Sequence, residues 1–166
     1  MFEAKTVPKN EKTDRLKELT LSKLAQHIAL VLTSDGTLLK STFDQSWTNL
    51  FYELRTNKVL GSMQGRPAIL DEIRFYSNGP ELSSNEVSET MRLINFGLAT
   101  AVGELVEHGW FINRRAGLNI QRSLDEMPDE YKKFVEKAVE IARQYVARKE
   151  NITDLLPLKL RNLIRS

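Results

Sequence analysis

The residues best suited to chemistry in this sequence are three arginines that lie close together. Arg114, Arg115 and Arg122 fall within residues 113–124, a stretch that contains no aspartate or glutamate. A guanidinium group binds phosphate through paired hydrogen bonds, and arginine makes the commonest specific contact with guanine. This cluster therefore indicates contact with a phosphate-bearing partner.

The charge of the whole chain is small, but its distribution along the sequence is uneven. The 166 residues carry a formal net charge of +2. Residues 59–112 hold three basic and seven acidic residues, whereas residues 113–166 hold twelve basic and eight acidic residues. The positive charge is local, which favours a defined contact with phosphate over general attraction to polyanions.

The motifs of the common enzyme classes are not found in the sequence. It contains no phosphate-binding loop, dinucleotide fingerprint, HExxH or GxSxG pattern. It has no cysteine, which excludes disulfides, thiolate zinc sites and cysteine nucleophiles. The two histidines, His27 and His108, are far apart in sequence, and we expect structural roles for both. We therefore expect no enzymatic activity, no cofactor and no metal.

Hydropathy along the chain indicates a cytoplasmic protein. The longest charge-free stretch near the middle, Leu93–Gly103, is far shorter than the ~20 apolar residues that a membrane span needs. The first fifteen residues are charged from Glu3 onward and lack the apolar core of a signal peptide.

Apolar spacing predicts two helices in the first third of the chain, after a disordered arm over residues 1–12. The first is expected from about Asp14 to Thr33, although Asp35-Gly36 leaves a hairpin as an alternative for its C-terminal part. The second is expected to end near Asn57, with Thr42 and Gln45 as a capping box. Its apolar stripe contains Phe43, Trp47, Leu50, Phe51 and Leu54.

The middle of the chain predicts three shorter helices. The first begins at Pro67 and is broken at Asn78-Gly79-Pro80. The second covers Asn85–Leu93 behind a capping box of Ser83 and Glu86, and a break is expected over residues 94–97. The third covers Gly97–His108 and ends at Gly109, a natural C-terminal cap.

After Gly109 the apolar pattern changes its period. Trp110, Ile112, Leu118 and Ile120 alternate with polar neighbours around residues 115–117, which predicts a short β-hairpin. A long amphipathic helix is expected from Pro128, and it is followed by a leucine-rich tail.

The stretch from Pro67 to Leu124 resembles the winged helix-turn-helix family, and the MarR-like regulators most of all. The segment GELVEHGWFINRR carries the resemblance most clearly, because it joins a helix, a glycine stop and an arginine-bearing strand. The resemblance implies a DNA-binding unit placed between helices that form a dimer. In that unit a supporting helix crosses the backbone and a second helix enters the major groove.

The resemblance also implies which residues contact DNA. Residues 85–93 would be the supporting helix, residues 97–108 the presented helix, and the hairpin a wing. The presented helix has no lysine or arginine and contains Glu104 and Glu107, so an arginine contact with guanine is unavailable there. The expected contacts are therefore wing arginines, polar side chains near the helices and two further arginines: Arg114, Arg115, Arg122, Thr100, Asn95, Ser84, Asn85, Arg92 and Arg66.

Together these features predict a mainly α protein with four segments. They are an arm (1–12), N-terminal helices (13–58), a winged helix-turn-helix with a short β-hairpin wing (59–125) and C-terminal helices (126–166). We expect a transcriptional regulator that binds duplex DNA as a homodimer through its flanking helices, with the identity of a small-molecule or protein effector left open. The alternative is a winged-helix adaptor that contacts protein in a replication or transcription complex.

Overall fold

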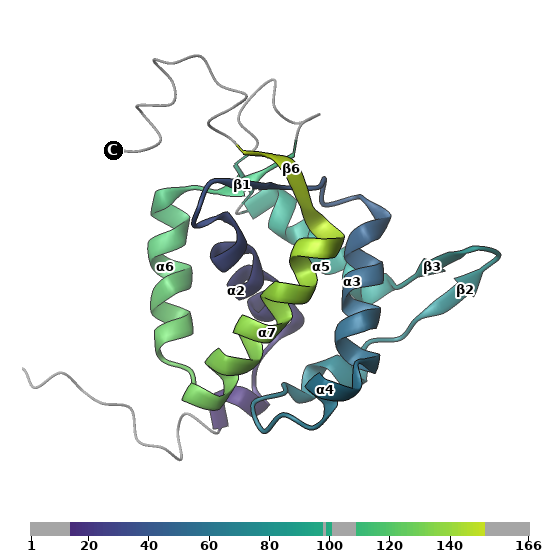
Figure 1. The fold of residues 1–166 in the computed structure, drawn as a ribbon, viewed down its shortest axis with the longest axis horizontal. Coiled ribbons are helices and arrows are strands. Elements are labelled where there is room, and N and C mark those ends of the chain that lie inside the picture. The colour runs from purple at the N-terminus through teal and green to yellow at the C-terminus, as the bar shows by residue number, and fades with distance from the viewer. Residues whose placement is uncertain (1–13, 98, 101–108, 152–166) are drawn as a thin grey trace, which may run out of the picture.

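The computed structural model describes residues 14–97, 99–100 and 109–151, and it confirms a mainly helical fold with short antiparallel strand pairs (Figure 1). Three helices, α2, α3 and α7, form its centre, while α5 and α6 pack against α2. The arm over residues 1–12 and the tail beyond residue 151 lie outside the described residues.

The first predicted helix is divided into two. Residues 14–17 are helical, and α2 (Leu21–Thr33) begins after a break in which the Thr20 hydroxyl accepts a hydrogen bond from the Lys23 N–H (3.1 Å). The end at Thr33 is as predicted. The hairpin alternative is wrong, because Gly36 turns the chain with a φ of 87° into the separate strand β1 (Thr37–Leu39).

The second predicted helix is present but begins slightly later than expected. In α3 (Gln45–Thr56) the Asp44 carboxylate caps the first turn by accepting from the Ser46 N–H (2.8 Å), in place of Thr42. Trp47 is buried as predicted, whereas Phe43 precedes the helix and is 70% exposed. A single turn, α4 (Lys58–Gly61), follows.

The predicted helix after Pro67 is only a 3₁₀ turn, η1 (Ala68–Glu72). The break at Asn78-Gly79-Pro80 is a hairpin turn with Gly79 at a φ of 62°, and it joins β2 (Tyr76–Asn78) to β3 (Glu81–Ser83). This hairpin projects from the body of the molecule beside α3 (Figure 1).

The predicted presented helix is wrong at its start. Helix α5 (Asn85–Gly97) runs through the expected break, and Ser84 rather than Ser83 caps it, since the Ser84 hydroxyl accepts from the Val87 N–H (3.3 Å). The next residues form β4 (Ala99–Thr100), which pairs with β5 (Phe111–Ile112). Residues 101–108, including His108, lie outside the described residues.

The predicted wing over residues 110–120 is also wrong, because residues from Arg114 onward form helix α6 (Arg114–Asp125). The Asn113 side chain accepts a hydrogen bond from the Ala116 N–H (2.8 Å) and so starts a helix directly after β5. Gly117, Ile120 and Leu124 are the residues that α6 buries, at spacings of three and four. That period places them on one face of a helix and cannot place them on one face of a strand.

The long helix after Pro128 is confirmed as α7 (Asp129–Val146), and it leads into β6 (Ala147–Asn151). Strand β6 pairs with β1, and Leu39 of β1 also exchanges backbone hydrogen bonds with Trp110 (2.9 and 3.0 Å). The N-terminal, middle and C-terminal segments of the chain are therefore joined at β1.

One hydrophobic core draws on all the helical segments, and α2 lies at its centre. Helix α2 packs against α5, α6 and α7, and α3 packs against α7. The apolar side of α7 is covered within the same chain, where α7 packs against α2 and α3. Its buried residues are Tyr131, Phe134, Val135, Ala138, Val139, Ala142 and Val146.

A buried polar cluster inside this core links helices α2, α6 and α7 by hydrogen bonds. His27 of α2 is fully buried, its Nδ1 lies 2.6 Å from the Tyr131 hydroxyl of α7, and its Nε2 lies 3.1 Å from the Ser123 hydroxyl of α6. Burial, with a smaller contribution from the charge of Lys23, lowers the pKa of His27 to about 4. Burial raises the pKa of Tyr131. Both groups are therefore neutral at pH 7.

This arrangement predicts that acid destabilises the fold through His27. Between its folded pKa of about 4 and its unfolded value of 6.5, the unfolded chain binds more protons at His27, so stability falls as the pH falls. From pH 7.5 to pH 5 we expect a loss of about 2 kcal/mol in the free energy of unfolding, and urea unfolding at the two pH values is the measurement that checks it. His27→Gln is expected to remove this component. An unchanged pH dependence in that variant would contradict the assignment.

Candidate nucleic-acid interface

Helix α6 carries the three clustered arginines at the edge of the molecule. Its inner face packs closely on α2, where a Cβ at Gly117 would lie 3.4 Å from the Leu30 Cδ1. Figure 1 shows α6 beside α2 with no described element on its outer side. Within the described ranges, the outer face of α6 is therefore exposed and not covered by another helix or strand.

The outer face of α6 presents guanidinium and amide groups in one stripe. Arg115, Asn119 and Arg122 are all exposed and follow each other at spacings of four and three residues, so they lie on one face. Arg114 and Leu118, both exposed, form the neighbouring row. These are the side-chain types that contact phosphates and base edges in protein–DNA complexes.

The electrostatics of α6 favour an anionic partner. Within the part of the chain that the structure describes, Arg114, Arg115 and Arg122 form no ion pair. The first turn of α6 contains Arg114 and Arg115 and no acid. The N-terminal end of a helix dipole is positive, so two arginines there are electrostatically unfavourable until an anion binds. The first acid of the helix is Asp125, whose carboxylate accepts from the Gln121 amide (2.8 Å). Among the described residues, no acidic side chain pairs with these three arginines.

The polar residues expected to contact bases lie on or beside α5 instead. Asn85 is exposed and Asn95 is half-buried, whereas Ser84 is buried as the helix cap. Arg92 is exposed but pairs with Glu89 (2.7 Å), and Thr100 lies in β4 opposite Phe111. The described outer face of α5 is therefore nearly neutral.

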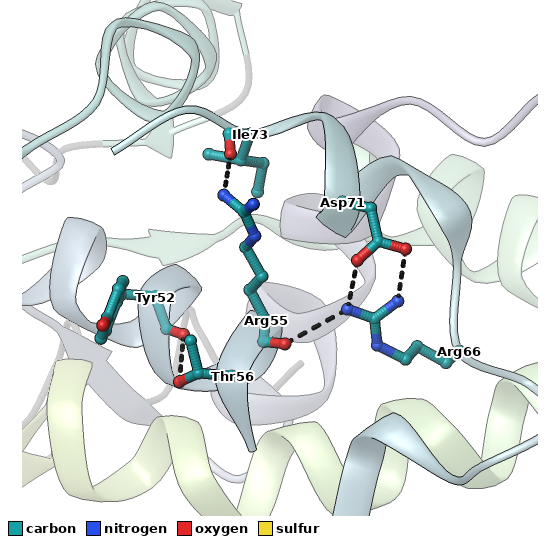
Figure 2. Close-up of polar contacts among 6 residues, drawn as sticks. All are labelled: Tyr52, Arg55, Thr56, Arg66, Asp71 and Ile73. Carbon is teal, nitrogen blue, oxygen red and sulfur yellow. Dashed lines mark hydrogen bonds and ion pairs between the residues drawn. The ribbon is translucent and has the colours of Figure 1, made fainter. Parts of the chain in front are cut away.

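Arg66 has a structural environment, as Figure 2 shows. Its guanidinium forms two hydrogen bonds with the Asp71 carboxylate (2.8 and 2.9 Å) and donates to the Arg55 carbonyl (3.2 Å). Arg55 in turn donates to the Ile73 carbonyl and lies over the Phe75 ring, which contacts Tyr52. These contacts fix the chain that leads from α3 into the β2–β3 hairpin.

The residues predicted to contact DNA thus lie on several elements. Arg114, Arg115 and Arg122 share α6, and Arg66 belongs to the base of the hairpin. Thr100 lies in β4, and the others lie on α5 or at its start: Ser84, Asn85, Arg92 and Asn95. Sequence reasoning missed Asn119 and Leu118, because the hairpin interpretation placed them in a strand. The spacing of Gly117, Ile120 and Leu124 was the signal that could have identified the helix.

The described residues give less support for a ligand pocket, a metal site or a membrane span. A cavity of about 130 Å³ lies between α3, β3 and α5, below the ~300 Å³ of the smallest usual ligand pockets. No group of three or more potential metal ligands occurs in the described ranges. None of the described helices combines the length and apolar character needed to cross a membrane.

Comparisons of the chain with protein-family models, curated proteins and solved structures find no match. The function must therefore be argued from the residues and their geometry.

The environment of Arg66 predicts a role in stability. Arg66→Ala is expected to lower the free energy of unfolding by about 1–3 kcal/mol, because it breaks a partly buried charged pair and leaves the Arg55 carbonyl without its donor. Chemical denaturation measures this change. The control is Arg92→Ala, which removes an exposed arginine from an exposed pair and is expected to leave stability nearly unchanged. Equal stability of the two variants would contradict the structural role.

Proposed function

We propose that this chain binds duplex DNA and that the outer face of α6 contacts it. The observation that carries the proposal is the set of three exposed arginines, Arg114, Arg115 and Arg122, which have no ion-pair partner among the described residues. Neutralisation of phosphates by such groups releases condensed counterions, which drives association at moderate salt. A cytoplasmic transcriptional regulator is the role that we assign to this binding.

The dimensions of α6 agree with a contact in the major groove. A helix of 12 residues is about 18 Å long, and the groove of B-DNA, about 12 Å wide, admits one α-helix. The inward face of α6 packs on α2, with Ile120 and Leu124 buried in the core and the Ser123 hydroxyl 3.1 Å from His27 Nε2. The side chains offered to DNA would therefore be held on a fixed support.

The winged-helix form of the proposal is supported by the order α2, β1, α3, α5, β4, β5, into which α4, η1 and the β2–β3 hairpin are inserted between α3 and α5. Strand β1 also bridges to Trp110 next to β5. In this arrangement β4 and β5 replace the wing that the sequence indicated at residues 110–120. Helix α5 would then be the presented helix of the family pattern. Its nearly neutral face favours α6 as the main DNA contact.

A protein-interaction adaptor is the second candidate. Exposed apolar side chains on the α3 side of the molecule favour it, since such groups commonly mark protein contacts. They are Phe43, Tyr52, Val59 and Tyr76. If the chain fails to bind duplex DNA at low salt, the adaptor becomes the better proposal.

The DNA-binding proposal predicts a strong effect of the α6 arginines on affinity. Replacing Arg114, Arg115 and Arg122 together with alanine is expected to weaken binding to duplex DNA at every salt concentration. The slope of log affinity against log salt becomes shallower by about 1 to 3, since each arginine that neutralises a phosphate contributes about 0.9. Fluorescence anisotropy over a salt series measures both quantities.

A control of equal charge separates this effect from net charge. Replacing Lys58, Lys133 and Lys137, all exposed on α4 and α7, removes the same formal charge away from α6. This variant is expected to keep most of the affinity and slope. Similar losses in both triple variants would contradict a defined α6 interface.

We also propose that the chain is a homodimer, with the exposed apolar side chains of the α3 side in the contact. Light scattering at micromolar concentration is expected to give about twice the chain mass of 19.0 kDa. Replacing Tyr52 and Val59 with serine is expected to lower that mass toward one chain, because both side chains are exposed and apolar. A single-chain mass for the unmodified protein would exclude the dimer.

A further inference from the structure

We infer that α6 reads base sequence in the major groove, with Asn119 selecting adenine between two guanine contacts made by Arg115 and Arg122. This inference rests on the proposed DNA binding and adds a specificity that phosphate contacts alone do not give. Asn119 is the new element, because neither charge nor clustering marks it in the sequence.

The spacing of the three side chains matches a short run of base pairs. At a rise of 1.5 Å per residue, Arg115 and Asn119 are about 6 Å apart along the helix axis, and Asn119 and Arg122 about 4.5 Å. Base pairs are stacked about 3.4 Å apart. Neighbouring side chains of the stripe therefore reach base pairs one or two steps apart, and the whole stripe covers three or four base pairs.

The amide of Asn119 is free to make the contact that adenine requires. It is exposed and forms no hydrogen bond with another described residue, whereas the nearby Gln121 donates its amide to Asp125 (2.8 Å). An asparagine amide offers one donor and one acceptor side by side, which matches N7 and N6 of adenine in the major groove. Among the described contacts, the Asn119 amide is therefore available to a base, whereas the Gln121 amide is already bonded to Asp125.

The surroundings of Asn119 support contact with a base edge. Leu118 precedes it and is 63% exposed, so an apolar side chain stands beside the polar stripe. Thymine carries a methyl group in the major groove that apolar side chains contact. Arg114 lies at the start of the helix, off the stripe, where a phosphate contact would position α6 without reading sequence.

The test is selection of binding sites from a randomised duplex library with the full chain, followed by affinity measurements on the selected sequence. We expect a core of three or four base pairs that contains guanine and adenine. Changing that adenine is expected to weaken binding of the unmodified chain 5- to 100-fold. Asn119→Ala is expected to lose most of this discrimination, because its affinities for the selected sequence and for the sequence with the changed adenine become similar.

Two further variants make the result specific. Gln121→Ala is the matched control, since it removes an amide that is already engaged, and it is expected to keep the discrimination. Asn119→Arg is expected to shift the preference at that position from adenine to guanine. Far-ultraviolet circular dichroism checks that each variant is folded.

The possible results distinguish base reading by α6 from the proposed binding of duplex DNA. Binding of the unmodified chain without sequence preference, or a preference that Asn119→Ala leaves intact, would overturn base reading while duplex binding stands. Failure of the unmodified chain to bind any duplex at low salt would overturn both.

Discussion

The burial of α2 is the constraint on which the rest of the structure depends. Leu24, Ala25, Ile28, Ala29 and Leu32 are all fully buried, and these residues point to more than one side of the helix. A helix that is apolar over so much of its circumference must be covered by several neighbours at once. Helices α5, α6 and α7 provide that cover, and the small residues at positions 25 and 29 allow close packing.

The same constraint determines which side of α6 is available for function. Gly117, Ile120 and Leu124 are buried, and Ala116 and Ser123 are half-buried beside them. The other residues of this 12-residue helix are exposed. The contact between His27 and Ser123 adds a directional hydrogen bond to this apolar packing. Arg114, Arg115 and Arg122 are thereby held in fixed positions on a packed helix, whereas arginines in a loop would have no fixed arrangement. The proposed contact with DNA would require such a rigid support, because side chains held in fixed positions lose less entropy on binding.

Sequence reasoning located most helices but misjudged the segment that matters most. Long amphipathic stretches such as α7 were predicted well because their apolar period extends over many residues. The segment after Gly109 was misjudged because Trp110 and Ile112 do belong next to or within a strand, and the alternation was extended too far. The Asn113 cap ends that strand and starts α6. The arginines were identified from charge, whereas Asn119 could be recognised only once α6 placed it between Arg115 and Arg122.

The most direct measurement of the central claim is a nitrogen-15 NMR titration of the full chain with a short duplex at low salt. The account predicts that the largest amide shift changes fall on residues 113–125 and that they decrease as salt is raised, because phosphate contacts are lost. Changes centred on α5 or on the β2–β3 hairpin, with α6 unaffected, would contradict it.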